Sequence, residues 1–221
     1  MWLGGALFVA SLAACAWRFL VSWSDPSVRS PARWPALLAN ALLFVVFAAH
    51  HSLFAREGVK NWLARLVPER LLRSVYVWVA SLLLLIVCLL WQPLGGDVSL
   101  VTGWQAVAHA VVQLAGLWLI ARAVGMMDPL ELAGIHRPSA AETLKITGPY
   151  QWVRHPLYLG WLLAVLGAAH MTGDRLAFAT MSSIYLVVAI PWEERSLART
   201  FGTQYEDYKR QVRWRVVPFV Y

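Results

Sequence analysis

The fold is decided by an uncharged run, Val75–Trp91, which reads VYVWVASLLLLIVCLLW. A helix that crosses a bilayer needs about 20 mostly apolar residues, and this run comes close to that length. Soluble domains usually carry about 25% charged residues, whereas this chain of 221 residues carries 14% and is 59% hydrophobic. Its mean hydropathy is +0.56. We therefore predict a helical membrane protein.

Apolar segments lie on both sides of this run. They are Trp2–Trp23, Trp34–Phe54 and Trp104–Val124, followed by two shorter pieces, Leu157–His170 and Leu176–Trp192. The shorter pieces predict a C-terminal helical hairpin packed against the bundle. The expected fold is an all-α polytopic membrane protein with about five to six transmembrane helices. We predict one domain over residues 1–221, with a four-helix front half (1–124) and a C-terminal part (125–221).

Lys and Arg are unevenly distributed among the connecting segments. The connector 56–73, the polar stretch 125–155 and the tail 193–221 carry most of them, and the loop 92–103 carries none. Because Lys and Arg concentrate in cytoplasmic loops, we predict an inner-membrane protein with both termini in the cytoplasm. The family resemblance described below implies that this membrane is bacterial. The turn 24–35, with Arg29 and Arg33, is the exception. The net charge of +7 suits contact with an anionic membrane leaflet. The chain is too apolar for a dissolved nucleic-acid-binding domain, so we predict no nucleic-acid partner.

Cysteine and histidine give no sign of a disulfide framework or a metal centre. Cys15 and Cys88 both lie inside apolar runs, where free cysteine behaves as a small hydrophobic residue. His50 and His51 end the second apolar segment without an acidic or Cys partner at ligand spacing. We therefore predict no metal site.

Two polar patches flank the predicted hairpin. The first, Tyr150–Tyr158, contains Arg154 and His155, and the second is Glu193–Arg195. The two ends of a helical hairpin lie together, so Arg154 and His155 should face the two glutamates. Carboxylates bind an ammonium group and Arg binds a carboxylate, so this cluster is suited to a zwitterion. The alternative is an ion-pair cluster without a ligand at the membrane surface.

The same patches carry two long motifs. Residues 148–160 read Gly-Pro-Tyr-x-x-x-Arg-His-Pro-x-Tyr-x-Gly, and residues 193–208 read Glu-Glu-x-x-Leu-x-x-x-Phe-Gly-x-x-Tyr-x-x-Tyr. Together they resemble the isoprenylcysteine carboxyl methyltransferase superfamily of integral membrane enzymes. The front half, around residues 51–76, is similar to the NnrU-like branch, which includes bacterial methanethiol S-methyltransferases.

The resemblance implies S-adenosylmethionine as the methyl donor, held in a cytoplasmic pocket, with the acceptor entering from the membrane. It implies that the donor is bound by Tyr150, His155, Pro156, Tyr158, Gly160, Glu193, Glu194, Arg195, Tyr205 and Tyr208. Among these, Glu193 and Glu194 would meet the donor ammonium. The Gly-rich fingerprint of soluble nucleotide-binding folds is not found in the sequence.

A thiol acceptor must lose its proton, because the thiolate is the nucleophile. The candidate bases are His51, His109, His155 and Glu194, and the sequence does not choose among them. We assign Arg154, His51 and Glu194 as the candidate catalytic residues.

Gln105, His109 and Gln113 recur every four residues in the fourth apolar segment and therefore share one helix face. We predict that they line a substrate channel. Interhelical hydrogen bonding is the alternative, because polar side chains inside bilayers often pair in that way.

The expected activity is methyl transfer to an apolar or membrane-soluble acceptor, with a small thiol such as methanethiol as the first choice. An isoprenylated cysteine carboxylate or a lipid amine is the alternative within the same chemistry. An NADPH-dependent sterol-type reductase and a non-catalytic accessory protein are the alternatives of other classes. The expected partners are the acceptor and the lipid bilayer, and the oligomeric state is left open.

Overall fold

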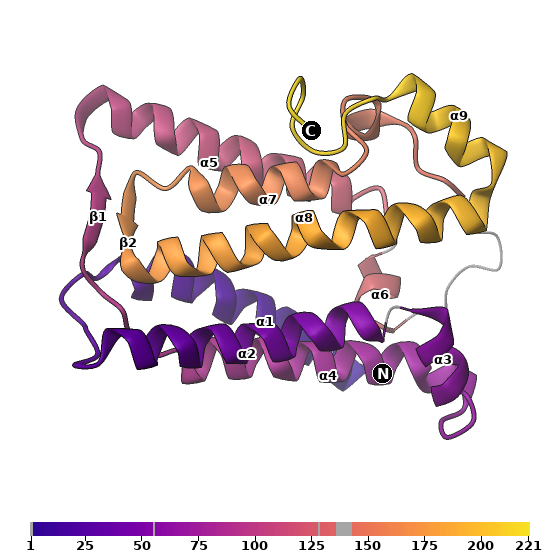
Figure 1. Cartoon of the computed structure of the whole chain (residues 1–221), viewed down its shortest axis with the longest axis horizontal. Helices are drawn as coiled ribbons and strands as arrows, with labels where there is room; N and C mark the ends of the chain where they lie inside the picture. The colour runs from indigo at the N-terminus through magenta and orange to yellow at the C-terminus, as the bar shows by residue number, and fades with distance from the viewer. Residues whose placement is uncertain (1, 55, 128, 136–142) are drawn as a thin grey trace. The chain divides into compact units, whose positions relative to one another are not determined.

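The computed structural model describes residues 2–54, 56–127, 129–135 and 143–221, and these are predominantly helical (Figure 1). The elements are α1 (Trp2–Leu20), η1 (Ser22–Ser24), α2 (Arg33–Leu53), α3 (Glu57–Leu63), α4 (Glu69–Leu90), β1 (Asp97–Leu100), α5 (Gly103–Val124), α6 (Pro129–Leu132), η2 (Gly148–Gln151), α7 (Pro156–Leu166), β2 (His170–Thr172), α8 (Gly173–Phe201) and α9 (Thr203–Gln211). The all-α prediction is confirmed, with a small two-stranded sheet of β1 and β2 as an addition.

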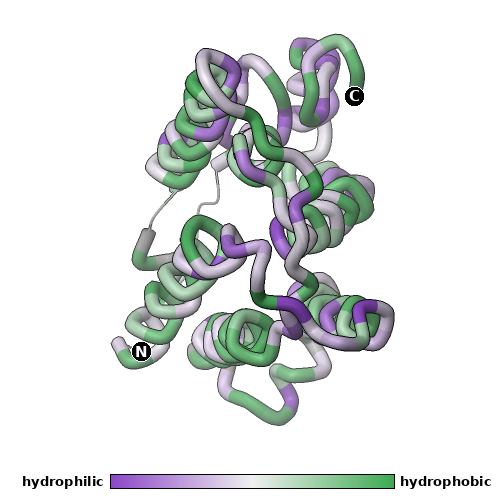
Figure 2. Tube along the Cα trace, turned by 90° about the vertical axis from the view of Figure 1, so that its left-hand side faces the viewer, coloured by the Kyte–Doolittle hydropathy of each residue, from purple (hydrophilic) through white to green (hydrophobic). Residues whose placement is uncertain are grey.

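Five helices of the described ranges are long and apolar enough to cross a membrane. The spans are Trp2–Ser24, Arg33–Leu53, Leu71–Leu90, Gly103–Val124 and Gly173–Phe201. Figure 2 shows hydrophobic residues running along the long helices. The eleven residues of α7 are also apolar, but at 1.5 Å per residue they reach only about 16 Å. The protein is therefore an integral membrane protein, as predicted.

The boundaries of the last two segments differ from the predicted ones. α7 ends at Leu166 instead of His170, and α8 continues from Gly173 to Phe201, past the expected end at Trp192. α8 also contains Pro191, which is tolerated because neighbouring groups can satisfy the freed carbonyl. The Glu193–Arg195 patch consequently lies within α8 and not in a loop after it.

The chain forms two compact units. Unit 1 comprises the described residues of Met1–Ser99, Pro129–Pro138 and His170–Met181, and unit 2 comprises those of Leu100–Asp128, Ser139–Ala169 and Ser182–Tyr221. The division does not follow the predicted boundary between residues 124 and 125, because α5 groups with the C-terminal part. The single methyltransferase domain stays a prediction. α8 begins in unit 1 and ends in unit 2.

Unit 1 has an aromatic core around Phe178. Its ring centroid lies 5.0 Å from that of Trp23, 6.0 Å from that of Trp91 and 6.1 Å from that of Phe44. These rings come from η1, from the C-cap residue of α4, from α2 and from the first turns of α8. The core therefore joins elements far apart in the sequence.

A buried carboxylate fixes the start of α8 in unit 1. Oδ1 of Asp174 accepts the Trp91 indole N–H at 2.7 Å and the Leu94 N–H at 2.9 Å, and Oδ2 accepts the Gly95 N–H at 2.8 Å. Its neighbour Arg175 donates to the carbonyls of Phe19 and Leu20 at the end of α1. Both side chains are buried, so this polar pair acts as a structural anchor.

Unit 2 is built on a close contact between α5 and α7 (Figure 1). A Cβ atom at Gly116 would lie 2.5 Å from the Ala164 nitrogen, and one at Gly160 would lie 2.8 Å from the Gly116 oxygen. Only glycine lets the two backbones approach so closely, as at other small-residue contacts between membrane helices. The predicted pocket residue Gly160 thus has a packing role.

Candidate functional site

The first motif is held in place by the C-terminal tail. Residues after η2 are irregular until His155, which caps the N-terminus of α7, with Pro156 as the first helical residue. The backbone N–H groups of Arg154 and His155 donate to the carbonyls of Trp214 and Arg215 at 2.9 and 2.8 Å. The Arg-His pair is therefore fixed by main-chain bonds to residues some sixty positions later.

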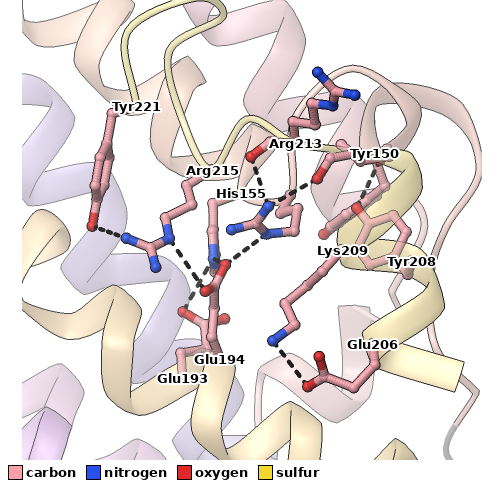
Figure 3. Close-up of polar contacts among 12 residues, drawn as sticks. Tyr150, His155, Glu193, Glu194, Glu206, Tyr208, Lys209, Arg213, Arg215 and Tyr221 are labelled. Carbon is pink, nitrogen blue, oxygen red and sulfur yellow. Dashed lines mark hydrogen bonds and ion pairs between the residues drawn. The ribbon is translucent and has the colours of Figure 1, made fainter. Parts of the chain in front are cut away.

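The predicted meeting of the two polar patches is observed (Figure 3). Oε1 of Glu194 lies 2.7 Å from Nε of Arg154 and 3.4 Å from Nε2 of His155. Oε2 of the same carboxylate lies 3.3 Å from Nε of Arg215. Glu194 is buried and both of its oxygens already contact cationic or imidazole groups.

Glu193 is the more available carboxylate. Its side chain is 44% exposed, against 9% for Glu194. The Tyr158 hydroxyl donates to its Oε2 at 2.5 Å, and Nδ1 of His155 lies 3.7 Å from the same oxygen. The Tyr158 ring also stacks on His155, with centroids 5.2 Å apart. Glu193 is thus oriented by its neighbours while one face stays open.

Arg154 fastens the tail to the site. Its Nη1 donates to the carbonyls of Val212 and Arg213, each at 2.8 Å, while its Nε is bonded to Glu194. The side chain is only 7% exposed. These contacts indicate a positioning role for the predicted catalytic residue Arg154.

The sequence motifs do not include Arg215, which completes this cluster. Its Nη1 donates to the Tyr221 hydroxyl at 2.8 Å, and its guanidinium lies over the Tyr221 ring, 5.0 Å from the centroid. Its partner Glu194 lies 21 positions earlier in the chain, a separation from which no local pattern predicts a contact. In the sequence, only the basic composition of the tail pointed to a further cationic residue at this cluster.

Three predicted tyrosines gather beside the charged cluster. The Tyr208 hydroxyl donates to the Tyr150 carbonyl at 2.7 Å, and the rings of Tyr205 and Tyr208 lie 6.0 Å apart. Burial, aided by the charge of Glu193, raises the pKa of Tyr150 to about 12. Burial is also the main cause that raises the pKa values of Tyr205 and Tyr208. All three phenols therefore stay neutral at physiological pH.

The Tyr205 hydroxyl is buried, and it neither donates nor accepts a hydrogen bond among the residues that the structure describes. The charges of Glu194 and Glu193 contribute to the raised pKa of this tyrosine, which places its phenol in their field. An unsatisfied buried hydroxyl is costly and is the kind of group that a ligand completes.

The predicted channel residues bond to the end of α7. Nδ1 of His109 lies 3.2 Å from the Gly167 carbonyl oxygen, and Nε2 of Gln113 donates to the Ala164 carbonyl at 2.9 Å. The last carbonyls of a helix have no partner within it, so these two side chains satisfy the C-terminus of α7. Gln105 is exposed. The structure thus shows interhelical bonding for two of the three, and the substrate channel stays a prediction.

The remaining predicted residues lie apart from these contacts. In unit 1, Nδ1 of His51 lies 2.9 Å from the Tyr76 hydroxyl, which joins the end of α2 to α4. In unit 2, Arg195 is exposed on α8 and Pro156 is buried. The predicted role of His51 in base catalysis and those of Arg195 and Pro156 in donor binding stay predictions.

Comparison with known proteins gives a consistent set of relatives. The family described as phospholipid methyltransferase matches residues 104–204. Methanethiol S-methyltransferase 2 from Bradyrhizobium diazoefficiens is 38% identical over 80% of this chain and 71% of its own length. Methanethiol S-methyltransferase from Crocosphaera subtropica is 34% identical over 84% and 76%. Nurim from Sus scrofa is 28% identical over 81% and 72%. No solved structure matches significantly.

Proposed function

This chain belongs to the isoprenylcysteine carboxyl methyltransferase superfamily of integral membrane methyltransferases, and on that premise we propose that it methylates a small thiol such as methanethiol with S-adenosylmethionine. The choice of acceptor is supported by the names of its relatives, which are methanethiol S-methyltransferases at 38% and 34% identity. The choice of donor is supported by the open carboxylate of Glu193, which Tyr158 orients.

The residues present fit an α-amino-acid donor. Glu193 offers a carboxylate for the ammonium group, and the buried Tyr205 hydroxyl still lacks a partner among the described residues. When bound, S-adenosylmethionine supplies a methyl group activated by its positively charged sulfur. Glu194, in contrast, is held by Arg154 and Arg215, so we assign the donor ammonium to Glu193 alone.

The proposed reaction requires the acceptor to be deprotonated. The thiolate sulfur forms a bond to the methyl carbon, the bond between that carbon and the donor sulfur breaks, and its electron pair stays on the donor sulfur. The thiol proton passes to a base. Because Glu194 is already committed to two guanidinium groups, the candidate bases reduce to His51, His109 and His155.

For His109, the contact with the Gly167 carbonyl selects one tautomer. A carbonyl oxygen only accepts, so Nδ1 carries the proton and Nε2 is the basic nitrogen. His155 differs, because both of its ring nitrogens face carboxylates: Nε2 faces Glu194 and Nδ1 faces Glu193. Of these two histidines, only His109 therefore has one basic nitrogen defined by its contacts.

We also propose that the site faces the cytoplasm. The tail that builds it carries Lys209, Arg210, Arg213 and Arg215, and the connector 56–73 is equally basic. Such segments remain on the cytoplasmic side of bacterial inner membranes. Labelling of a single cysteine introduced at exposed Arg195 should then require a reagent that crosses the membrane.

The test is formation of dimethyl sulfide by purified protein supplied with S-adenosylmethionine and methanethiol, followed by gas chromatography. Glu193→Gln removes a charge-assisted hydrogen bond, worth about 1.5–3 kcal/mol, and should lower kcat/KM for the donor roughly 10- to 150-fold. Glu206→Gln is the matched control, because Glu206 is exposed and its carboxylate pairs with Lys209, its one ion-pair partner in the described part of the chain. Its rate should equal that of the wild type.

Two results would contradict the proposal in different ways. Full activity of Glu193→Gln would remove Glu193 from the donor site. Absence of dimethyl sulfide from protein that still binds S-adenosylhomocysteine would refute the thiol acceptor and favour a lipid amine, the acceptor class suggested by the phospholipid methyltransferase description. An isoprenylated cysteine carboxylate would be tested in the same panel.

A further inference from the structure

Arg215 lies outside both sequence motifs, yet its guanidinium lies beside the predicted donor site (Figure 3). A guanidinium carries five N–H donors in a planar fork. In Arg215, Nε faces Glu194 and Nη1 donates to Tyr221, whereas Nη2 makes no hydrogen bond to any residue that the structure describes. Tyr221 and Glu194 thus hold the guanidinium in one orientation and leave Nη2 available for a ligand.

The two arginines of the cluster differ in accessibility. The Arg154 side chain is 7% exposed and donates to two tail carbonyls, so it is part of the protein interior. The Arg215 side chain is 37% exposed. A ligand in contact with exposed Glu193 therefore reaches Arg215 more readily than Arg154.

The charges of the cluster also balance. Arg154 and Arg215 contribute +2, and Glu193 and Glu194 contribute −2, which gives a net charge of zero. A zwitterion adds no net charge and pairs both of its ends. A ligand with an ammonium group alone would leave Nη2 of Arg215 without a partner among the described residues.

We propose that Arg215 binds the carboxylate of the donor's amino-acid group, while Glu193 binds its ammonium. This inference rests on the proposed function and adds a specificity to it. The site selects donors that retain an α-carboxylate and discriminates against decarboxylated analogues. A guanidinium–carboxylate contact suits this task because a charge-assisted N–H···O bond is directional as well as electrostatic.

The test compares two ligands by calorimetry on the full-length protein. One is S-adenosylhomocysteine, and the other is the same molecule without its carboxylate. Wild-type protein should bind the complete ligand about 10- to 100-fold more tightly, the factor expected for one charge-assisted pair. Arg215→Gln should lose that factor for the complete ligand and leave affinity for the decarboxylated one unchanged. Arg199→Gln, an equal charge change at an exposed position on α8, should preserve the preference.

The comparison separates this inference from the proposed function. Equal affinity of the wild type for both ligands would refute carboxylate recognition without affecting the proposal of methyl transfer. This measurement needs no variant. Loss of both affinities to the same extent in Arg215→Gln would show that Arg215 acts only by holding the tail, which also overturns the inference. Failure of folded wild type to bind S-adenosylhomocysteine would instead refute the proposed donor.

Discussion

Glu194→Gln should loosen the C-terminal tail without unfolding the helices. The substitution removes the negative charge that faces Arg154 and Arg215. Arg154 stays buried, with its side chain 7% exposed, and breaking one partner of a buried pair costs about 3–5 kcal/mol. Because Arg154 keeps its two bonds to tail carbonyls, we expect a loss near the lower end, about 3 kcal/mol.

Hydrogen exchange measures this loss where it occurs. The N–H groups of Arg154 and His155 are bonded to the Trp214 and Arg215 carbonyls and exchange when the tail opens. A loss of about 3 kcal/mol corresponds to roughly 150-fold faster exchange. The matched variant Glu193→Gln changes a carboxylate that is exposed and not bonded to either arginine, so exchange at these two amides should stay as in the wild type.

The reasoning fails if Glu194→Gln leaves the exchange of both amides unchanged but abolishes donor binding. Glu194 would then be a ligand group, and the contacts with Arg154 and Arg215 would contribute little to the folded tail.

Three further perturbations test separate parts of the structure. Gly116→Ala should lower stability by about 1–3 kcal/mol, measured by thermal unfolding in detergent, because the new Cβ would lie 2.5 Å from the backbone of α7. Gly58→Ala is its control and should not be destabilised, because a Cβ there would meet no tertiary neighbour within 4 Å among the described residues. Asp174→Ala should cost about 1–3 kcal/mol for each buried donor left unpaired, seen as a lower midpoint in the same assay, and an unchanged midpoint would exclude the anchor. The raised pKa of Tyr150 (about 12 against 10.0) stabilises the neutral phenol in the folded state, so this contribution is complete below pH 10 and is lost as the pH rises through about 12; ultraviolet titration should find its ionisation delayed, and an ordinary titration would contradict the burial.

The membrane helices could be predicted from the sequence because each carries its own signal. The apolar run at 75–91 needs no distant partner to form a helix, and α4 contains nearly all of it. The predicted end of α8 at Trp192 was wrong for the opposite reason, because its last turns depend on partners far away in the sequence. Charged residues after Trp192 suggested a loop, but Glu194 is stabilised inside a helix by arginines from two other segments.

The sequence predicted which two polar patches meet, but it did not predict how their side chains are arranged. The motifs brought Arg154, His155 and the two glutamates together, as observed. They treated the glutamates as equivalent, whereas one is exposed and the other is bonded to both arginines. That difference depends on Arg215, whose position results from the folding of the tail.

The central claim is tested most directly by measuring binding of S-adenosylhomocysteine to purified wild-type protein by calorimetry. We expect binding in the micromolar range, strongly weakened in Glu193→Gln. Well-folded protein that binds no S-adenosylhomocysteine, or that binds NADPH in its place, would contradict the account.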